Sequence, residues 1–182
     1  MKSKILKSLK EARFDMLEHV KKWLEYKREQ FPNKLKVLRH EIALKKVKPL
    51  EWLILQDCPK KIYWENRTQN EQFAGIGSAI DFKDGKEGYE KILSEIRKLL
   101  QNSADSIRIF GGTRFDHKAK YSEEWNDWGT ALFSLPMVEL SIVNDNITLA
   151  CHVYTCKDLF KNLLDLQKIL ESMRVEDISI PD

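Results

Sequence analysis

The sequence contains little cysteine, glycine or proline, and it contains no long apolar run. Among its 182 residues there are 3 Cys, 7 Gly and 5 Pro. An odd number of cysteines without paired spacing favours reduced thiols over a disulfide framework. No apolar run approaches the ~18 residues that a membrane-spanning helix requires, and the first residues show neither the apolar core nor the cleavage site of a secretion signal. We therefore expect a cytoplasmic protein with no membrane partner.

Groups of residues that bind metals or perform acid–base chemistry are also scarce. Cys151, His152 and Cys156 are close in the sequence, but adjacent residues of a strand point to opposite faces, so Cys151 and His152 cannot bind one ion. His117 follows Asp116 in a polar stretch, and such neighbours are usually solvated rather than part of an acid–base relay. The sequence therefore predicts no catalytic residue and no metal site.

The glycine pairs do not form cofactor loops. The Gly-Ile-Gly at residues 75–77 follows a strand pattern, but Ile80 stands where a dinucleotide fingerprint needs its third glycine. The Gly-Gly-Thr at residues 111–113 lacks the Gly-Lys-Ser/Thr ending of a phosphate loop, and Ser78 lacks the context of a nucleophile elbow. We expect no cofactor bound to this chain.

Charge is unevenly distributed along the chain, although the net charge is only +3. Residues 1–50 carry 15 Lys and Arg against 6 Asp and Glu, and the remainder carries 16 against 22. A basic segment together with five tryptophans invites a nucleic-acid interpretation. The lysines of the first helix, however, alternate with acids at ion-pair spacings, and tryptophans beside aliphatic residues are typical of core or interface anchors. We expect no nucleic-acid partner.

Hydrophobic periodicity predicts the secondary structure. Apolar residues recur at threes and fours over 5–30, 88–100 and 157–173, which predicts three helices. Alternating apolar residues on both sides of the turn at 144–146 predict a hairpin of two strands. Further β-rich runs predict an antiparallel pair and additional strands. The pair is expected at 52–56 and 62–65, and the other strands at 72–82, 106–112 and within 35–48.

The order of these elements predicts an α+β fold with an antiparallel sheet flanked by helices. Strands cluster in the middle, with helices at both ends and one crossover helix, whereas a doubly wound parallel sheet would alternate strand and helix throughout. We expect a single domain. It would comprise a helical, basic segment over residues 1–48 and the sheet, the crossover helix and the last helix over 49–174, with a linker or tail over 175–182.

An ordered set of short motifs occupies residues 50–155. A Tyr-Trp with a following Arg precedes an Ala-Gly-x-Gly, then an aromatic-Gly-Gly with a downstream Phe, and finally a Leu-Pro with a following Glu-Leu. In this order the set resembles the N-terminal region of isochorismate synthases, in the chorismate-utilising enzyme family that includes anthranilate synthase component I. The motif residues, which we expect to be structural, are Tyr63, Trp64, Arg67, Gly75, Gly77, Gly111, Gly112, Phe115, Pro136 and Glu139.

The resemblance implies half of an α/β sandwich in which two halves surround a chorismate pocket. That family converts chorismate to isochorismate with Mg²⁺, a lysine base and a glutamate acid, all of them in the C-terminal half. The resemblance therefore assigns no catalytic, metal or substrate-binding residue to this chain. Anthranilate synthases carry a Leu-Leu-Glu-Ser tryptophan site where this chain has residues 74–77, so tryptophan inhibition is not expected here.

These implications lead to two expectations for function. The first is the structural N-terminal half of an isochorismate synthase of menaquinone or siderophore biosynthesis, lacking its catalytic half and inactive alone. Its partner would be a C-terminal chorismate-binding half in the same or a separate polypeptide, and chorismate and Mg²⁺ would bind only with that half. The alternative is a stand-alone, non-catalytic interaction module that docks on a separate chorismate-binding subunit or another protein.

Overall fold

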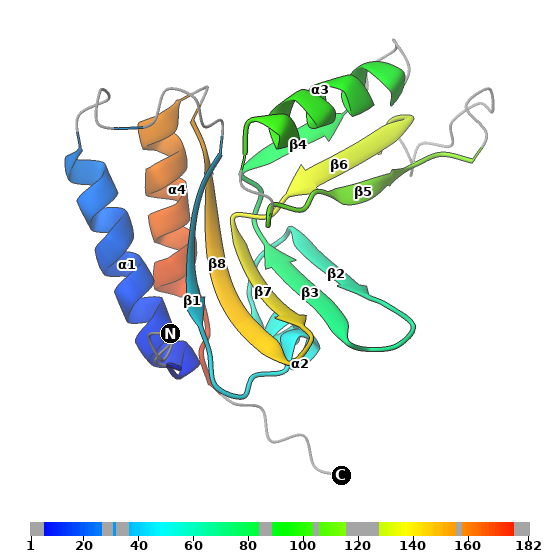
Figure 1. Cartoon of the computed structure of the whole chain (residues 1–182). Helices are drawn as coiled ribbons and strands as arrows, with labels where there is room; N and C mark the ends of the chain where they lie inside the picture. Colours follow the sequence, from blue (N-terminus) through cyan, green and yellow to red (C-terminus); the bar gives the residue numbers. More distant parts are fainter. Residues whose placement is uncertain are drawn as a thin grey trace.

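Two antiparallel sheets set at an angle, with helices on their outer sides, make up the computed structural model (Figure 1). The structure describes residues 6–26, 31, 37–83, 89–103, 106–115, 128–155 and 158–176. Its helices are α1 (Leu9–Glu25), α2 (Pro49–Leu55), α3 (Tyr89–Gln101) and α4 (Leu159–Ser172). Its strands are β1 (Val37–Ala43), β2 (Lys61–Glu65), β3 (Glu71–Ile76), β4 (Ile80–Lys83), β5 (Phe110–Thr113), β6 (Ala131–Leu135), β7 (Val138–Val143) and β8 (Asn146–Tyr154).

The larger sheet has the strand order β1-β8-β7-β3-β2, and every pair in it is antiparallel. Its centre is the β7–β8 hairpin, in which Val143 pairs with Asn146. Asn144 and Asp145 have φ of 48° and 65°, the left-handed conformations that a two-residue hairpin turn requires and that Asn and Asp tolerate. The predicted hairpin is therefore confirmed, together with the strand expected within residues 35–48.

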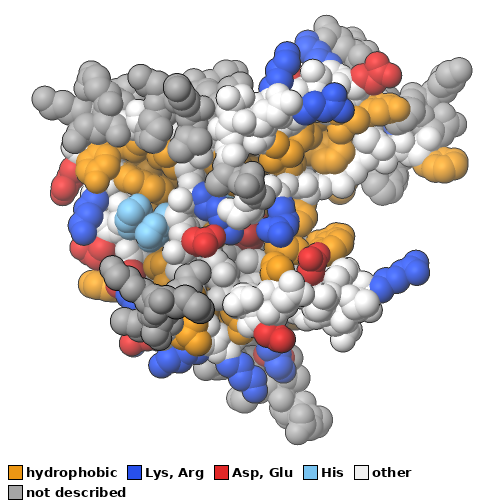
Figure 2. All heavy atoms as spheres, in the orientation of Figure 1, with side chains coloured by type: hydrophobic (Ala, Val, Ile, Leu, Met, Phe, Trp, Pro, Cys, Tyr) orange, Lys and Arg blue, Asp and Glu red, His pale blue; other side chains and the backbone are white. Residues whose placement is uncertain are grey.

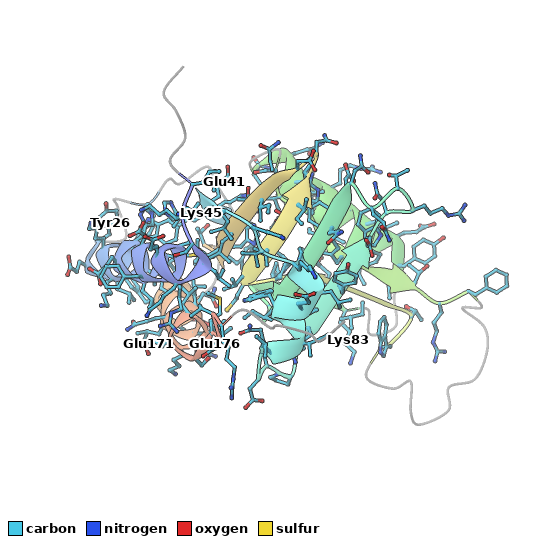
Figure 3. All side chains as sticks on the ribbon, turned by 90° about the horizontal axis from the view of Figure 1, so that it is seen from below. Tyr26, Glu41, Lys45, Lys83, Glu171 and Glu176 are labelled. Atoms are coloured by element: carbon cyan, nitrogen blue, oxygen red, sulfur yellow. The ribbon has the colours of Figure 1, made fainter. Side chains whose placement is uncertain are left out.

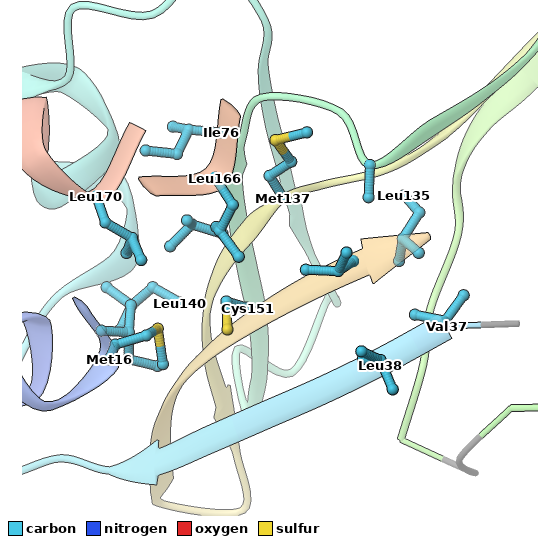
Figure 4. Close-up of a cluster of buried hydrophobic side chains, with 14 of the residues drawn as sticks. Met16, Val37, Leu38, Ile76, Leu135, Met137, Leu140, Cys151, Leu166 and Leu170 are labelled. Atoms are coloured by element: carbon cyan, nitrogen blue, oxygen red, sulfur yellow. The ribbon is translucent and has the colours of Figure 1, made fainter. Parts of the chain in front are cut away.

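Helices α1 and α4 lie side by side on one face of this sheet (Figure 1). Ser8 caps α1 through a reciprocal capping box with Glu11, which satisfies two amide donors that would otherwise lack partners. Seen from below, the helix pair forms one side of the molecule, around which Tyr26, Glu171 and Glu176 lie (Figure 3). The core between helices and sheet includes Ala12, Met16, Val20, Leu140, Leu149, Cys151, Leu163, Leu166 and Leu170, several of which appear in Figure 4.

The segment expected as a strand at 52–56 is helical, so that prediction was wrong. Pro49 stands in the first turn of α2, where its missing N–H costs nothing and its fixed φ suits a helix. Trp52 and Leu53 are buried, whereas Ile54 is 63% exposed. This pattern of burial is typical of a short helix that lies with one side against a surface. Because this segment is helical, β2 pairs with β3 instead.

The strand expected over 72–82 is two strands that belong to different sheets. The chain leaves β3 at Gly77, whose φ of 66° is left-handed and is readily adopted only by glycine. It then enters β4 in the smaller sheet, whose order is β4-β6-β5. The strand expected at 106–112 is confined to residues 110–113, and strand β6 was not predicted.

Helix α3 crosses over from β4 to β5, which are both antiparallel to β6 and therefore parallel to each other. The α+β class with antiparallel strands and one crossover helix is confirmed, although the strands divide between two sheets. Within the described ranges, no helix is long and apolar enough to cross a membrane. Asp116, His117 and Cys156, which the sequence singled out, lie outside the described residues.

Candidate functional site

A buried polar cluster lies on the face of the larger sheet that points away from α1 and α4. Arg39 of β1 and His152 of β8 are register partners, so their side chains share one face. Cys151, the neighbour of His152, belongs to the helix-covered core, which agrees with the expectation that these two residues point to opposite faces. Arg39 donates from Nη1 to Nε2 of His152 and from Nε to Glu41 Oε2 at 3.1 Å. The Arg39 side chain is 7% exposed.

The contact made by Nδ1 of His152 shows which ring nitrogen carries the hydrogen. Nδ1 lies 2.9 Å from the carbonyl oxygen of Pro136, and a carbonyl can only accept, so Nδ1 carries the hydrogen and Nε2 accepts from Arg39. Burial, reinforced by the charge of Arg39, lowers the pKa of His152 to about 3. His152 is therefore a neutral structural link between β1 and the segment that joins β6 to β7.

Glu139 of β7 completes the cluster and is fully buried. Its Oε1 accepts from Arg39 Nη1 at 3.3 Å, whereas its Oε2 has no hydrogen-bond partner in the described part of the chain. Burial raises the pKa of Glu139, and the positive charges of Arg39 and Arg108 act against that rise. The carboxylate is thus held by one guanidinium at a large cost in desolvation.

Three of the motif residues meet beside this cluster. Gly75 is the register partner of Glu139, and a Cβ on Gly75 would lie 2.6 Å from Cβ of Pro136. A Cβ on Gly77 would lie 2.5 Å from Cδ1 of Ile169. The expected structural role is consistent with these contacts, because a side chain at either glycine would force the close-packed segments apart.

The two sheets diverge and enclose a notch, which we define by its lining residues Trp64, Phe73, Leu93, Ile96, Leu100, Arg108 and Phe110. Its volume is about 500 Å³. Figure 2 shows the molecule hollowed between two lobes that both carry hydrophobic side chains. The Arg108 guanidinium lies 4.5 Å from the centroid of the Phe73 ring, a cation–π contact at the base of the notch.

A second cavity, of about 570 Å³, opens between β2 and β5 and shares Phe110 and Gly111 with the notch. Tyr63, Gly112 and Trp128 line it. The Tyr63 hydroxyl donates to Glu65 Oε2 at 3.1 Å, and burial together with this bond raises the pKa of Tyr63. The two cavities are distinct, because the notch takes Trp64 of β2 and the second cavity takes its neighbour Tyr63, and neighbouring residues of a strand point to opposite faces.

Asp81 ties the two sheets together at the edge of the second cavity. Its Oδ1 accepts from Ser78 Oγ at 2.6 Å and from Ser134 Oγ at 2.8 Å, and its Oδ2 accepts from Lys60. Burial acts to raise the pKa of Asp81, but the bonds from Lys60, Ser78 and Ser134 outweigh it and lower the pKa. Lys60 precedes β2 of the larger sheet, whereas Ser134 belongs to β6, so this carboxylate links both sheets.

The remaining motif residues lie apart from the polar cluster. Arg67 is exposed in the turn between β2 and β3, Trp64 is 44% exposed, and Phe115 is fully exposed. The structure therefore brings only part of the predicted set together. Arg39 and His152 were missed as site residues. A signal was available for His152, which is a polar side chain between apolar neighbours of β8, but not for Arg39, which is followed by the polar His40 and Glu41 in β1.

The described residues do not fit a magnesium site. No group of three or more His, Cys, Asp or Glu is placed to hold a metal ion in the parts of the chain described. Oε2 of Glu139 is a buried carboxylate oxygen without a hydrogen-bond partner among the described residues, but Arg39 already supplies its positive charge, whereas Mg²⁺ takes several oxygen ligands and waters. No chemical step through Mg²⁺ is assigned to this cluster.

The fold and the motif cluster define a member of a known enzyme family. Residues 19–178 match the family described as chorismate binding enzyme, and the chain belongs to it. Isochorismate synthase 2 of Arabidopsis thaliana is 31% identical over 107 residues, which are 59% of this chain and 19% of that protein. Isochorismate synthase of Catharanthus roseus is 31% identical over 81 residues, which are 44% of this chain and 14% of that protein.

A solved structure shares the fold. MenF, the menaquinone-specific isochorismate synthase of Escherichia coli, superposes with a TM-score of 0.66 at 17% identity over 94% of this chain and 36% of that one. This chain thus spans about a fifth or less of the plant proteins and about a third of MenF. The recognition of the family and the expected fold are confirmed.

Proposed function

We propose that this chain is the structural, non-catalytic half of an isochorismate synthase of menaquinone or siderophore biosynthesis, acting in the cytoplasm. The observation that carries the proposal is the notch between the two sheets. Trp64, Leu93 and Leu100 are 39–44% exposed there although a buried aromatic, Phe73, lies directly behind them. A contiguous apolar hollow of this kind is typical of a surface that receives another protein segment.

Burying the walls of the notch would contribute to binding. Each Å² of apolar surface removed from water stabilises a contact by about 25 cal/mol, and large aromatic side chains contribute most. In this proposal the second half, in the same or a separate polypeptide, fills the notch and carries the chorismate and Mg²⁺ sites. This chain contributes a rigid scaffold, whose orientation Arg39, His152 and Asp81 maintain. Neither a nucleic acid nor a membrane is needed as a partner.

The proposal has a direct test. The purified chain, incubated with chorismate and Mg²⁺, should form no isochorismate above the rate of a protein-free control. Adding the remainder of MenF, expressed without the segment that this chain matches, should give a complex by size-exclusion chromatography. Turnover by this chain alone, or failure to form a complex under conditions in which the matching MenF segment forms one, would overturn the proposal.

A stand-alone interaction module is the second candidate. Phe115, at 105% exposed, favours it, because a fully exposed phenylalanine beyond a strand end is more typical of an anchor for another protein than of a folded core. In this alternative the chain docks through Phe115 on a separate chorismate-binding subunit or on another protein. Phe115→Ser should then weaken that contact, whereas the first candidate predicts that it leaves binding to the remainder of MenF unchanged, because Phe115 does not line the notch.

A further inference from the structure

Helix α4 ends without the local signals that usually end a helix. Its C-cap is Met173, whose backbone is extended with φ of −62° and ψ of 123°, rather than the left-handed glycine that closes many helices. No basic residue stands in the last turn of α4, and the next residues include Met173, Arg174 and Glu176, which are types that favour helices. The local sequence therefore allows α4 to continue.

A side chain from α2 holds the chain just after α4. Gln56, which follows α2, accepts from the backbone N–H of Arg174 at 2.9 Å through Oε1 and donates from Nε2 to the carbonyl oxygen of Arg174 at 3.1 Å. The N–H and C=O of one residue point to the same side in extended backbone, whereas in a helix they point to opposite ends. Gln56 is 3% exposed, so its amide selects the extended form of Arg174 from inside the protein.

A second contact comes from α1, whose start lies beside the end of α4 (Figure 1). Arg13 Nη1 donates to the carbonyl oxygen of Met173 at 2.9 Å. A cation is favourable at the C-terminus of a helix, where the helix dipole is negative, and here another helix supplies it. Three hydrogen bonds from residues far away in the sequence thus meet at Met173 and Arg174.

The residues 173–176, which we call the exit segment, are buried in the pattern of an extended chain. Met173 is 2% exposed and Val175 packs against the core, whereas Arg174 and Glu176 are exposed. Residues two apart share a side in an extended segment, but in a helix they point about 200° apart. Continuing α4 would therefore remove either Met173 or Val175 from the core.

We propose that Gln56 and Arg13 form a latch that ends α4 at Ser172 and holds the exit segment extended, and that α4 continues through the exit segment when the latch is open. The latch sets the direction in which a polypeptide attached after residue 176 leaves the fold, because a continuing helix would carry it along the axis of α4. The notch takes no part in this device, so the inference goes beyond the proposed function and does not depend on it.

Nuclear magnetic resonance of the full chain tests the latch, because ¹³Cα chemical shifts distinguish helical from extended backbone. The wild-type exit segment should show extended values. Gln56→Leu removes both bonds to Arg174 at a similar side-chain size, and it should move the shifts of the exit segment about halfway or more to helical values. Arg13→Met opens the other side of the latch and should move Met173 and Arg174 in the same direction by a smaller amount.

The matched control is Gln167→Leu, the same chemical change on α4 itself. Gln167 donates to Glu171 in an exposed pair and does not touch the exit segment, so its removal should leave the shifts of that segment at wild-type values. The shifts of β8 separate opening of the latch from loss of the fold, because they should be unchanged in every variant. Arg13 is only half-buried, so Arg13→Met carries the test if Gln56→Leu does not fold.

Two results would overturn the latch. If the exit segment of a folded variant keeps wild-type extended shifts, Gln56 and Arg13 do not hold it; if the segment becomes unstructured, α4 has no tendency to continue. Either result leaves the proposed function standing, since no isochorismate assay and no complex with the remainder of MenF enters this experiment. Helical shifts in Gln56→Leu together with extended shifts in Gln167→Leu support the latch.

Discussion

His19 of α1 and His40 of β1 stack with their ring centroids 3.7 Å apart and their planes 6° apart. Trp23 stands edge-on to both rings. Burial, followed by the nearby charges of His40 and Lys22, lowers the pKa of His19 to about 4. Burial also lowers the pKa of His40, with Glu41 acting in the opposite direction. The stack therefore joins α1 to the sheet in an environment that favours neutral imidazoles.

The histidine stack predicts a loss of stability in mild acid. An unfolded His19 titrates near 6.5 and the folded one near 4, so between these pH values the unfolded chain binds more protons and stability falls as the pH falls. Between pH 7 and pH 5, the free energy of unfolding of the wild type should fall by about 1 kcal/mol more than that of His19→Phe, after allowance for solvent screening. Urea unfolding at both pH values measures this difference.

The design isolates one histidine. Glu139, whose pKa is raised, favours the folded state at low pH and so opposes the histidines, but it is common to both proteins and cancels in the comparison. An equal loss of stability in the wild type and in His19→Phe would show that the stack does not sense pH.

Arg39 should contribute far more to the stability of the fold than its exposed ion-pair partner Glu41 does. Arg39→Met would leave the Glu139 carboxylate buried without its counter-charge, which costs about 3–5 kcal/mol. Adding Glu139→Gln should recover part of that loss, because a neutral amide is cheaper to bury. Glu41→Gln is the control, since Glu41 is 42% exposed and should change stability by less than about 1 kcal/mol. Additive effects of the two buried substitutions in urea unfolding would contradict the coupling.

Gly75→Ala should destabilise the fold through Pro136. The new Cβ would lie 2.6 Å from Cβ and 2.9 Å from Cγ of that proline, and such overpacking costs about 1–3 kcal/mol. Pro136→Gly removes both clashing carbons, so the double variant should lose less than the sum of the single ones. Denaturant unfolding of the four proteins of this cycle provides the measurement, and strict additivity would show that the two residues do not clash.

Asp81 should control how firmly the two sheets are joined. Asp81→Asn keeps the size of the side chain but weakens the bonds from Lys60, Ser78 and Ser134, which should cost about 1 kcal/mol. Amide hydrogen exchange should accelerate in β4 and β6 and remain unchanged in β8. Asp165→Asn is the matched control, because Asp165 faces Lys168 at 3.8 Å in an exposed pair. Equal exchange in the two variants would argue against a role for Asp81 between the sheets.

Local patterns were sufficient for some elements and misleading for others. The hairpin was predictable because Asn144 and Asp145 suit its turn and apolar residues alternate on both sides of it. The run at 52–56 was predicted to be a strand because its side chains favour strands intrinsically. In the structure it is helical, because a short helix buries one side of this segment, including Trp52 and Leu53, and leaves the other side exposed. Strand β6 was missed because its pairing with β4 and β5 connects residues that are distant in the sequence.

The sequence by itself determined the family, the α+β class, the helices α1, α3 and α4 and the central hairpin, because these depend on periodicity, turn residues and ordered motifs. Only the tertiary structure decided that Arg39 shares a site with Glu139 and His152, because strand register brings it next to residues 100 and 113 positions away in the chain. It also separated Gly111 from Gly112. Adjacent glycines are identical in sequence, and only packing reveals that a Cβ on Gly111 would meet the backbone of β6, whereas one on Gly112 would meet no described atom within 4 Å.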